Sequence, residues 1–431
     1  MHIPFVSSLM NLSPIKRQSV IQLGFTILVT LAGFVSTMIF SHLLGKDLMG
    51  VFYLFCTYFS IFNLIGDSGF GEATVKRISE GKDQNEYFTA YMTLRTILII
   101  VSTLILLLIQ PLFVDLATYQ LVPLIILALV VAYFAHGISI GVRAKNHVGI
   151  YNTGLGISEL VRIGLSILLV FIGFSVYGMI GGYIVGLLLS GLLCIKYFKY
   201  RPAKFTRYHL KNLLTFSLWI LLISAAGTIM GYADTIFIGY FMNNGDVGVY
   251  RVALSFTMIA LFIANAVYST LPPKISYWST HNKMEEIPPV ISRSITYGLV
   301  LAIPAAVGGI LLVDELLYFF YGADFAEGSV CCCILLFQQV VNVFLMFIGV
   351  ALSNSGYVRK TFYGTLAALI LNVVLDIILI PGLGPIPAFG INGAAIGSLV
   401  AIIVNVVIVG YLMKKIMTFK IEGKPLIHII I

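Results

Sequence analysis

The sequence predicts an all-α polytopic membrane protein with about 12 transmembrane helices, arranged as two pseudo-symmetric six-helix bundles. Of its 431 residues, 59% are hydrophobic and 10% are charged, whereas soluble domains carry roughly 25% charged residues. Apolar stretches of about 20 residues, the length that crosses a bilayer core, recur along almost the whole chain. The second half of the sequence also repeats the pattern of the first half.

Twelve apolar stretches account for the predicted helices. The N-terminus lacks a short apolar core followed by a small-residue cleavage site, so no cleavable signal peptide is expected before them. The predicted spans are residues 18–41, 47–72, 87–110, 119–142, 150–173, 176–196, 212–240, 247–271, 290–313, 330–352, 360–381 and 389–413.

The distribution of Lys and Arg predicts the orientation. Basic residues gather before the first span, after every even-numbered span and at the end of the chain. By contrast, the loops after odd-numbered spans, together with the first turn of the span that follows each, hold only Lys46 and Arg251. Cytoplasmic loops of membrane proteins collect Lys and Arg. We therefore expect a multi-pass protein of the cell membrane with both termini in the cytoplasm. The predicted organisation is an N-terminal bundle over 1–196, a basic cytoplasmic linker over 197–211, a C-terminal bundle over 212–413 and a cytoplasmic tail over 414–431.

An internal repeat relates the two halves. A shift of 198 residues places Thr30 on Thr228 and Gly50 on Gly248, and a shift of 212 matches the ends of the halves. Each half has an even number of spans, so both enter the membrane in the same direction. Repeats of this kind are related by a pseudo-two-fold axis along the membrane normal and leave a substrate cavity between them.

Small polar residues recur on one face of the first and seventh spans. Spacings of three and four residues place such side chains on a single helix face. We predict that this face lines the cavity; the alternative is close helix packing, which small residues also permit. The predicted lining residues are Gln22, Thr26, Thr30, Ser224 and Thr228.

Charged residues inside the spans are the candidate functional groups, because intramembrane ionisable residues usually face a bundle interior or a water path. Arg95, Arg162 and Arg251 are predicted to offer a cationic cavity to an anionic substrate, since the arginine fork suits phosphate. Asp234, Glu159 and Asp376 are candidates for titration or cation binding that couples transport to an ion gradient. The alternative for the Glu159–Arg162 and Asp234–Arg251 pairs is a purely structural ion pair.

Several function classes lack their signatures. The net charge of +8 is carried by short loops, so topology explains it better than nucleic-acid binding. The run Cys331, Cys332 and Cys333 lacks zinc-site spacing, and no metal or cofactor is expected beyond a coupling ion, H⁺ or Na⁺. Neither a P-loop nor the H-E-x-x-H or G-x-S-x-G motif occurs, so ATP hydrolysis and these hydrolase chemistries are not indicated.

Three segments carry a family resemblance: DSGFGEATVKRISEG after the second span, YADTIFIGYFMNNGDVGVYRVALSF across the seventh and eighth, and LNVVLDIILIPGLGPIPAFGINGAAIGSLV across the last two. In their order and spacing they resemble polysaccharide-biosynthesis flippases, the polysaccharide-transporter branch of the multidrug/oligosaccharidyl-lipid/polysaccharide superfamily. The resemblance implies a V-shaped, two-bundle transporter like the multidrug exporters of that superfamily. It also implies alternating-access transfer of a polyprenyl-diphosphate-linked oligosaccharide from the inner to the outer leaflet.

The resemblance implies the membrane, the lipid-linked oligosaccharide and glycan-assembly enzymes as partners. An ion-coupled multidrug exporter of the same superfamily is the alternative, although three intramembrane arginines argue against a cavity for cationic drugs. A membrane-embedded enzyme is a further alternative, but no catalytic carboxylate or metal cluster is evident on an outer loop. We therefore expect a transporter and not an enzyme.

Overall fold

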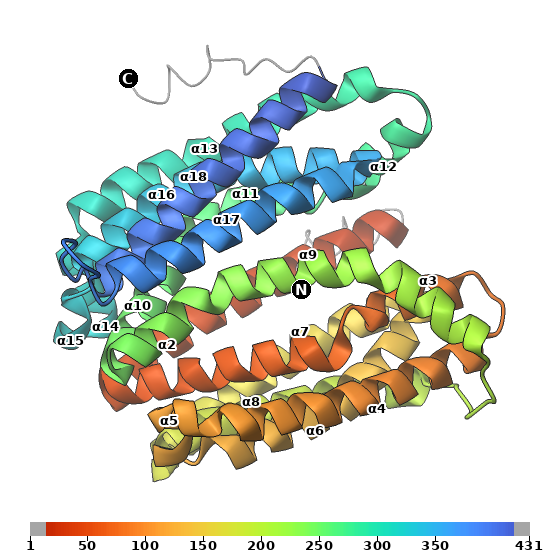
Figure 1. Ribbon diagram of the computed structural model, residues 1–431, viewed down its shortest axis with the longest axis horizontal. Helices are drawn as coiled ribbons and strands as arrows, with labels where there is room; N and C mark the ends of the chain where they lie inside the picture. The colour runs from red at the N-terminus through yellow and green to blue at the C-terminus, as the bar shows by residue number, and fades with distance from the viewer. Residues whose placement is uncertain (1–13, 418–431) are drawn as a thin grey trace, which may run out of the picture. The chain divides into compact units, whose positions relative to one another are not determined.

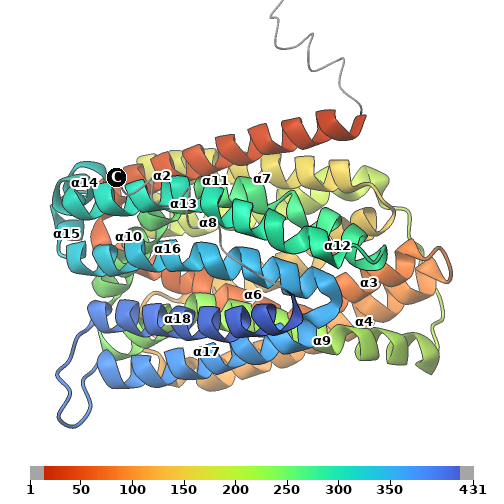
Figure 2. The same cartoon turned by 90° about the horizontal axis from the view of Figure 1, so that it is seen from above.

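The computed structural model describes residues 14–417, with side chains except at residues 14–23, 26 and 216–220. Every regular element of this part of the chain is helical (Figures 1 and 2). The first half holds α2 (Pro14–Asp67), α3 (Phe70–Ser79), α4 (Gln84–Ile109), α5 (Val114–Thr118), α6 (Leu121–Ala144), α7 (Val148–Leu169) and α8 (Ser175–Cys194). The second half holds α9 (Arg207–Phe241), α10 (Asn244–Thr257), α11 (Phe262–Tyr268), α12 (Leu271–Thr280), α13 (Ile287–Leu311), α14 (Val313–Tyr321), α15 (Ala323–Ala326), α16 (Ser329–Leu352), α17 (Val358–Leu379) and α18 (Ile391–Ile416).

Nine continuous helical stretches of the described chain are long and apolar enough to cross a membrane. Three of these stretches each contain a break at a glycine with positive φ: Gly45 at 73°, Gly173 at 103° and Gly356 at 88°. Glycine adopts this conformation without the penalty that other residues incur. Counting both sides of each of the three breaks gives 12 spans in the described chain, which agrees with the predicted number.

Two predicted spans end differently from the expectation. The second was predicted to reach Glu72, but the helix ends at Asp67, because Ser68 and Gly69 take left-handed φ values of 46° and 72° before α3 begins. The eighth was predicted as one helix over 247–271, but α10 ends at Thr257 and a short 3₁₀ turn leads into α11. A Pro pair at the first turn of α12 then starts a separate helix, a position that proline favours.

The chain forms two compact units. Unit 1 comprises the residues up to Leu43 together with Tyr58–Leu221, and unit 2 comprises Leu44–Thr57 together with Leu222 and the residues that follow it. The part of α2 that follows Leu43 therefore belongs to unit 2, whereas the beginning of α9 belongs to unit 1. Each unit takes one helical segment from the other half of the sequence.

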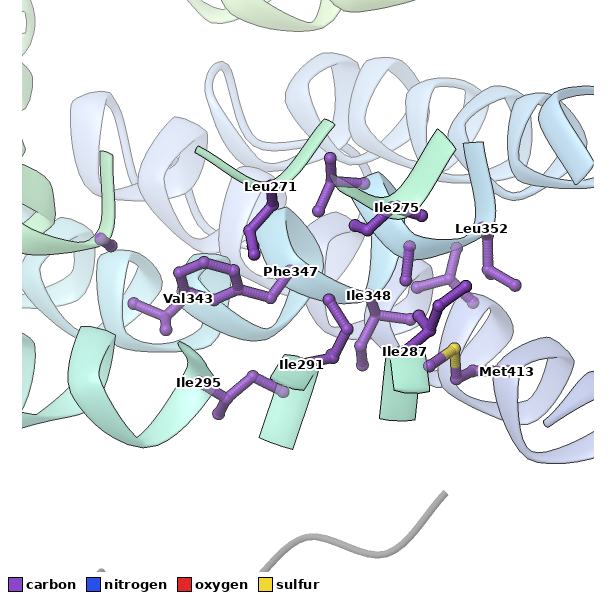
Figure 3. Packing of buried hydrophobic residues seen from close by; sticks show 14 of the residues in the cluster. Leu271, Ile275, Ile287, Ile291, Ile295, Val343, Phe347, Ile348, Leu352 and Met413 are labelled. Carbon is purple, nitrogen blue, oxygen red and sulfur yellow. The ribbon is translucent and has the colours of Figure 1, made fainter. Parts of the chain in front are cut away.

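Each unit has its own apolar core. In unit 1, Phe88, Tyr91 and Tyr200 belong to a buried cluster that joins α4 to the segment after α8. In unit 2, Ile291 of α13 and Phe347 of α16 belong to a larger cluster to which α12 and α18 also contribute (Figure 3). These cores hold the helices that carry the charged residues.

Candidate ion and substrate sites

Asp234 is the centre of a buried polar cluster in unit 2. Its carboxylate accepts hydrogen bonds from the Tyr250 hydroxyl, from Asn372 Nδ2 at 3.1 Å and from Ser398 Oγ at 2.7 Å. Asn372 Nδ2 also lies 3.3 Å from Ser398 Oγ. The donors come from α10, α17 and α18, so the carboxylate on α9 ties four helices together. All four residues are at most 7% exposed, and the cluster is therefore shielded from bulk solvent.

Asp376 lies beside this cluster and is fully buried. It follows Asn372 by one turn of α17, so both side chains lie on the same helix face, and it interacts electrostatically with Asp234. Both carboxylate oxygens of Asp376 and the amide oxygen of Asn372 are buried without a hydrogen-bond donor in the described chain. A Cβ on Gly397 of α18 would lie 2.9 Å from Asp376 Oδ1, so this glycine makes room for the carboxylate.

The acid pair has the chemistry to hold a proton or a small cation. Ionised carboxylates only accept hydrogen bonds, and two like charges held together in a poorly solvated place strongly disfavour the doubly ionised state. A shared proton or a monovalent cation between Asp234 and Asp376 removes that repulsion. The unpaired oxygens of Asp376 and Asn372 are ligands of the kind that hard cations take.

The sequence allowed an ion pair between Arg251 and Asp234, but the structure does not show one. Its Nη1 donates to the carbonyl of Gly231 at 3.3 Å, and its guanidinium lies 5.5 Å from the ring centre of Tyr53 and 5.2 Å from that of Tyr232. Because α10 carries Tyr250 and Arg251 consecutively, one side chain reaches the acid cluster and the other points to the aromatic pair. The Arg251 charge is thus held by ring faces and a carbonyl, and no acid of residues 14–417 forms an ion pair with it.

Arg162 pairs with Glu159 in unit 1. Its Nε lies 2.6 Å from Glu159 Oε2, one turn earlier on α7, and its guanidinium lies 5.8 Å from the ring centre of Tyr183 on α8. The side chains of Arg162 and Glu159 are 25% and 44% exposed. The predicted ion pair is present, and its partial exposure leaves the guanidinium reachable by a ligand.

Arg95 has a different environment from the other two arginines. It is fully buried in unit 1, where it donates to the Tyr91 hydroxyl at 2.7 Å and to the carbonyl of Ala132 at 3.1 Å. Asp67 lies 3.9 Å from Arg95 Nη1 and accepts a hydrogen bond from Tyr91. The guanidinium therefore joins α4, α6 and the end of α2 from within the unit, where protein groups already bind it.

None of the predicted lining residues of α2 and α9 whose side chains are described is buried. Thr30 and Ser224 are exposed and Thr228 is half-buried, whereas the side chains of Gln22 and Thr26 lie outside the described residues. A Cβ added at Gly33 or at Gly231 would meet nothing within 4 Å. Close helix packing does not explain the small residues at these two positions.

Sequence reasoning missed three members of the acid cluster: Tyr250, Asn372 and Ser398. Each is an uncharged polar residue in an apolar helix, and such residues are common enough to pass unnoticed. Asn372 stood four residues before Asp376, which was the one signal that could have identified it. Only the folded chain shows that these residues from three helices meet at Asp234.

The sequence profile described as "Polysaccharide biosynthesis protein" matches residues 39–330. The chain belongs to the polysaccharide biosynthesis protein family. This assignment confirms the resemblance found in the sequence. The family profile covers the three candidate arginines, as well as Asp234, but it ends before Asp376.

Two relatives are named as flippases, and two solved structures share the fold. The chain is 27% identical to the probable low-salt glycan biosynthesis flippase Agl15 of Haloferax volcanii and 26% identical to the probable flippase AglR of the same organism; each alignment covers 90% of this chain and 81% of the relative. The fold is similar to that of lipid II flippase MurJ in an inward closed conformation, with a TM-score of 0.78 at 18% identity over 95% of this chain and 90% of that one. It is also similar to an inward-facing MATE family transporter, with a TM-score of 0.66 at 17% identity over 92% of this chain and 98% of that one.

Proposed function

We propose that the protein is a flippase that moves a polyprenyl-diphosphate-linked oligosaccharide from the inner to the outer leaflet of the cell membrane, for surface polysaccharide or glycan biosynthesis. Its family, and the two Haloferax relatives named as flippases, support this reaction class. The buried acid pair Asp234–Asp376 is the observation that carries the proposal of ion-coupled transport.

The acid pair is the proposed coupling site. Burying two adjacent carboxylates is costly unless a proton or a cation neutralises them. The fraction of proteins with an ion bound at this pair therefore depends on the ion gradient. Asp234 also bonds to three other helices. A change of charge at this carboxylate therefore changes how α9, α10, α17 and α18 are held, which is how ion binding would favour one conformation over another.

Arg162 and Arg251 are the proposed contacts for the diphosphate. Each guanidinium is close to a tyrosine ring. Within the part of the chain that the structure describes, Arg251 has no acidic partner to displace before it binds an anion. The Arg162–Glu159 ion pair would be replaced by a stronger, bidentate contact between Arg162 and a phosphate group. Arg95 was predicted to join them, but its protein partners in unit 1 favour a structural contribution.

The transport cycle we propose is alternating access, in which two repeated halves open in turn to each side of the membrane. The sugar and the diphosphate cross between the halves while the polyprenyl chain stays in the bilayer. Both termini lie in the cytoplasm in this proposal, and glycan-assembly enzymes supply and consume the lipid-linked glycan. The protein moves its substrate without changing it chemically.

The test is leaflet exchange in vesicles containing the full chain and a fluorescent polyprenyl-diphosphate oligosaccharide. We expect protein-dependent movement that responds to an imposed H⁺ or Na⁺ gradient. Asp376→Asn should remove the response to the gradient, and Arg251→Gln should slow movement in every gradient. The exposed Arg293→Gln serves as the matched control and should behave like the original protein.

Other outcomes would test the coupling site and the flippase reaction separately. Movement that is unaffected by either gradient and by Asp376→Asn would reject the coupling site but retain the flippase. Absence of movement together with gradient-driven export of a cationic dye would favour the alternative, an ion-coupled multidrug exporter. The buried acid pair is compatible with that alternative, whereas the ring-held Arg251 favours an anionic substrate.

A further inference from the structure

The segment that joins the two halves of the sequence is basic and aromatic. We call residues 195–211 the strap; it contains no Asp or Glu. Its six cations are all exposed: Lys196, Lys199, Arg201, Lys204, Arg207 and Lys211. Between them, Ile195, Tyr197 and Tyr208 are 52%, 38% and 65% exposed. Because the strap connects the membrane-crossing stretch that ends at Tyr197 to α9, which contains the next one, it lies next to the membrane surface.

The strap is fastened to unit 1 by its backbone. Arg201 N donates to Asn85 Oδ1 at 3.2 Å, and Ala203 N donates to Thr89 Oγ1 at 3.1 Å. Lys145 Nζ donates to the carbonyl of Lys199 at 3.4 Å. Asn85 and Thr89 are one turn apart on α4, so α4 offers a row of acceptors that fits an extended chain.

Aromatic packing also holds the strap against the rest of unit 1. The Tyr200 ring stacks on Phe88 with centres 4.4 Å apart, and its hydroxyl donates to the carbonyl of Gly141 at 3.0 Å. Lys145 lies 4.5 Å from the centre of the Tyr200 ring. In the part of the strap that belongs to α9, the His209 ring packs edge-on against the Tyr87 ring with centres 4.9 Å apart. The inward side chains anchor the strap, and its cations remain outside.

We propose that the strap is a preformed binding surface for the anionic phospholipid headgroups of the membrane that the protein spans. A basic loop that served only as an orientation signal during insertion would need no fixed conformation. Here the ordering has already occurred in the folded protein, so binding headgroups costs little further conformational entropy. Exposed tyrosines between the cations suit the boundary between headgroups and acyl chains, where amphipathic rings gather. The proposal is independent of the transported substrate.

The experiment compares lipid selectivity in phosphatidylcholine vesicles that hold the full chain and a trace of spin-labelled phosphatidylglycerol or spin-labelled phosphatidylcholine. The protein-restricted fraction of each label gives a relative association constant. We expect phosphatidylglycerol to be preferred, with a preference that falls as salt screens the charges. In the triple variant Lys199→Gln, Arg201→Gln, Lys204→Gln, the preference for phosphatidylglycerol should fall by about tenfold or more. Each basic residue near an anionic surface contributes roughly a factor of five to the association constant.

Two comparison variants isolate the strap and its fastening. Lys274→Gln, Lys283→Gln, Arg293→Gln removes three exposed cations from the second half and should leave most of the preference. Asn85→Ala, Thr89→Val keeps every cation but removes the two side-chain oxygens that accept hydrogen bonds from the strap backbone, and should lose part of the headgroup preference.

Three results would overturn the proposal. The first is an equal loss in both triple variants, which would show that total charge alone attracts the lipid. The second is the absence of any headgroup preference in the original protein. The third is retained selectivity in the strap variant together with lost binding of inorganic diphosphate, which would assign the strap to the diphosphate of the transported lipid.

Discussion

Gly50 and Gly248, which a shift of 198 residues places on each other, meet in the folded chain. A Cβ on Gly50 would overlap the carbonyl of Asn244 and lie 3.1 Å from Gly248 N; a Cβ on Gly248 would overlap the carbonyl of Lys46 and lie 3.1 Å from Gly50 N. Lys46 and Asn244 are also matched by the same shift. The α2–α10 crossing in unit 2 is therefore locally symmetric, with the same contact made in both directions.

This crossing predicts that both glycines are intolerant of a side chain. Gly50→Ala and Gly248→Ala should each destabilise the protein by about 1–3 kcal/mol, the usual cost of overpacking, because the obstacle is backbone and cannot rotate away. The apparent melting temperature of the purified protein in detergent would measure the effect. Gly227→Ala is the control, since a Cβ there meets nothing within 4 Å; an equal loss in the control would contradict the prediction.

Arg95 should contribute to stability far more than the exposed arginines do. Arg95→Ala is expected to cost about 3–5 kcal/mol, because it removes one partner of a buried ion pair and leaves a cavity. Arg95→Lys should rescue little, since a single ammonium cannot reproduce the planar fork that reaches Tyr91 and Ala132. Arg162→Ala, at a partly exposed pair, should change the melting temperature only slightly. If all three variants were equally stable, the structural assignment of Arg95 would be wrong.

Gly397 should set how well the acid pair accommodates an ion. Gly397→Ala places a Cβ 2.9 Å from Asp376 Oδ1, which should displace the carboxylate and weaken the response of transport to an ion gradient by about tenfold, comparable to the loss of one well-placed ligand contact. The measurement is transport rate against ion concentration. Gly410→Ala on the same helix, where a Cβ meets nothing within 4 Å, should leave the curve unchanged.

The Lys46–Glu327 ion pair in unit 2 should matter little to stability. The side chains are 31% and 49% exposed, and exposed pairs contribute about 0–1 kcal/mol. Lys46→Gln should therefore shift the melting temperature slightly at low salt and not at all at high salt, because salt screens exposed charges. A large, salt-independent loss would show that the pair is effectively buried.

Arg251→Lys should impair transport nearly as much as Arg251→Gln. The guanidinium plane lies near the rings of Tyr53 and Tyr232, and an ammonium offers neither the stacking plane nor the bidentate fork. The assay is the same vesicle exchange measurement, with Tyr232→Phe as a variant that keeps the ring and should retain activity. Full activity of Arg251→Lys would show that only the positive charge at this position matters, and not the shape of the guanidinium.

The sequence by itself determined the number of spans, the family and the residues worth examining. Hydropathy and length suffice for spans because a lipid environment forces backbone hydrogen bonds into helices. The repeat could also be read directly, as the match of Gly50 to Gly248 shows. Charges in apolar runs marked Asp234, Asp376, Arg162 and Arg251 as candidates, since such charges are costly and seldom incidental.

Only the tertiary structure decided which of these residues meet. The sequence allows an Asp234–Arg251 ion pair. In the folded chain Asp234 instead accepts from Tyr250, and Arg251, the next residue on α10, lies near two aromatic rings. Asp376 lies 142 positions after Asp234 in the chain, and no local pattern links them. Helix periodicity fixes the face on which a residue lies, whereas its neighbour depends on how helices from distant parts of the chain pack.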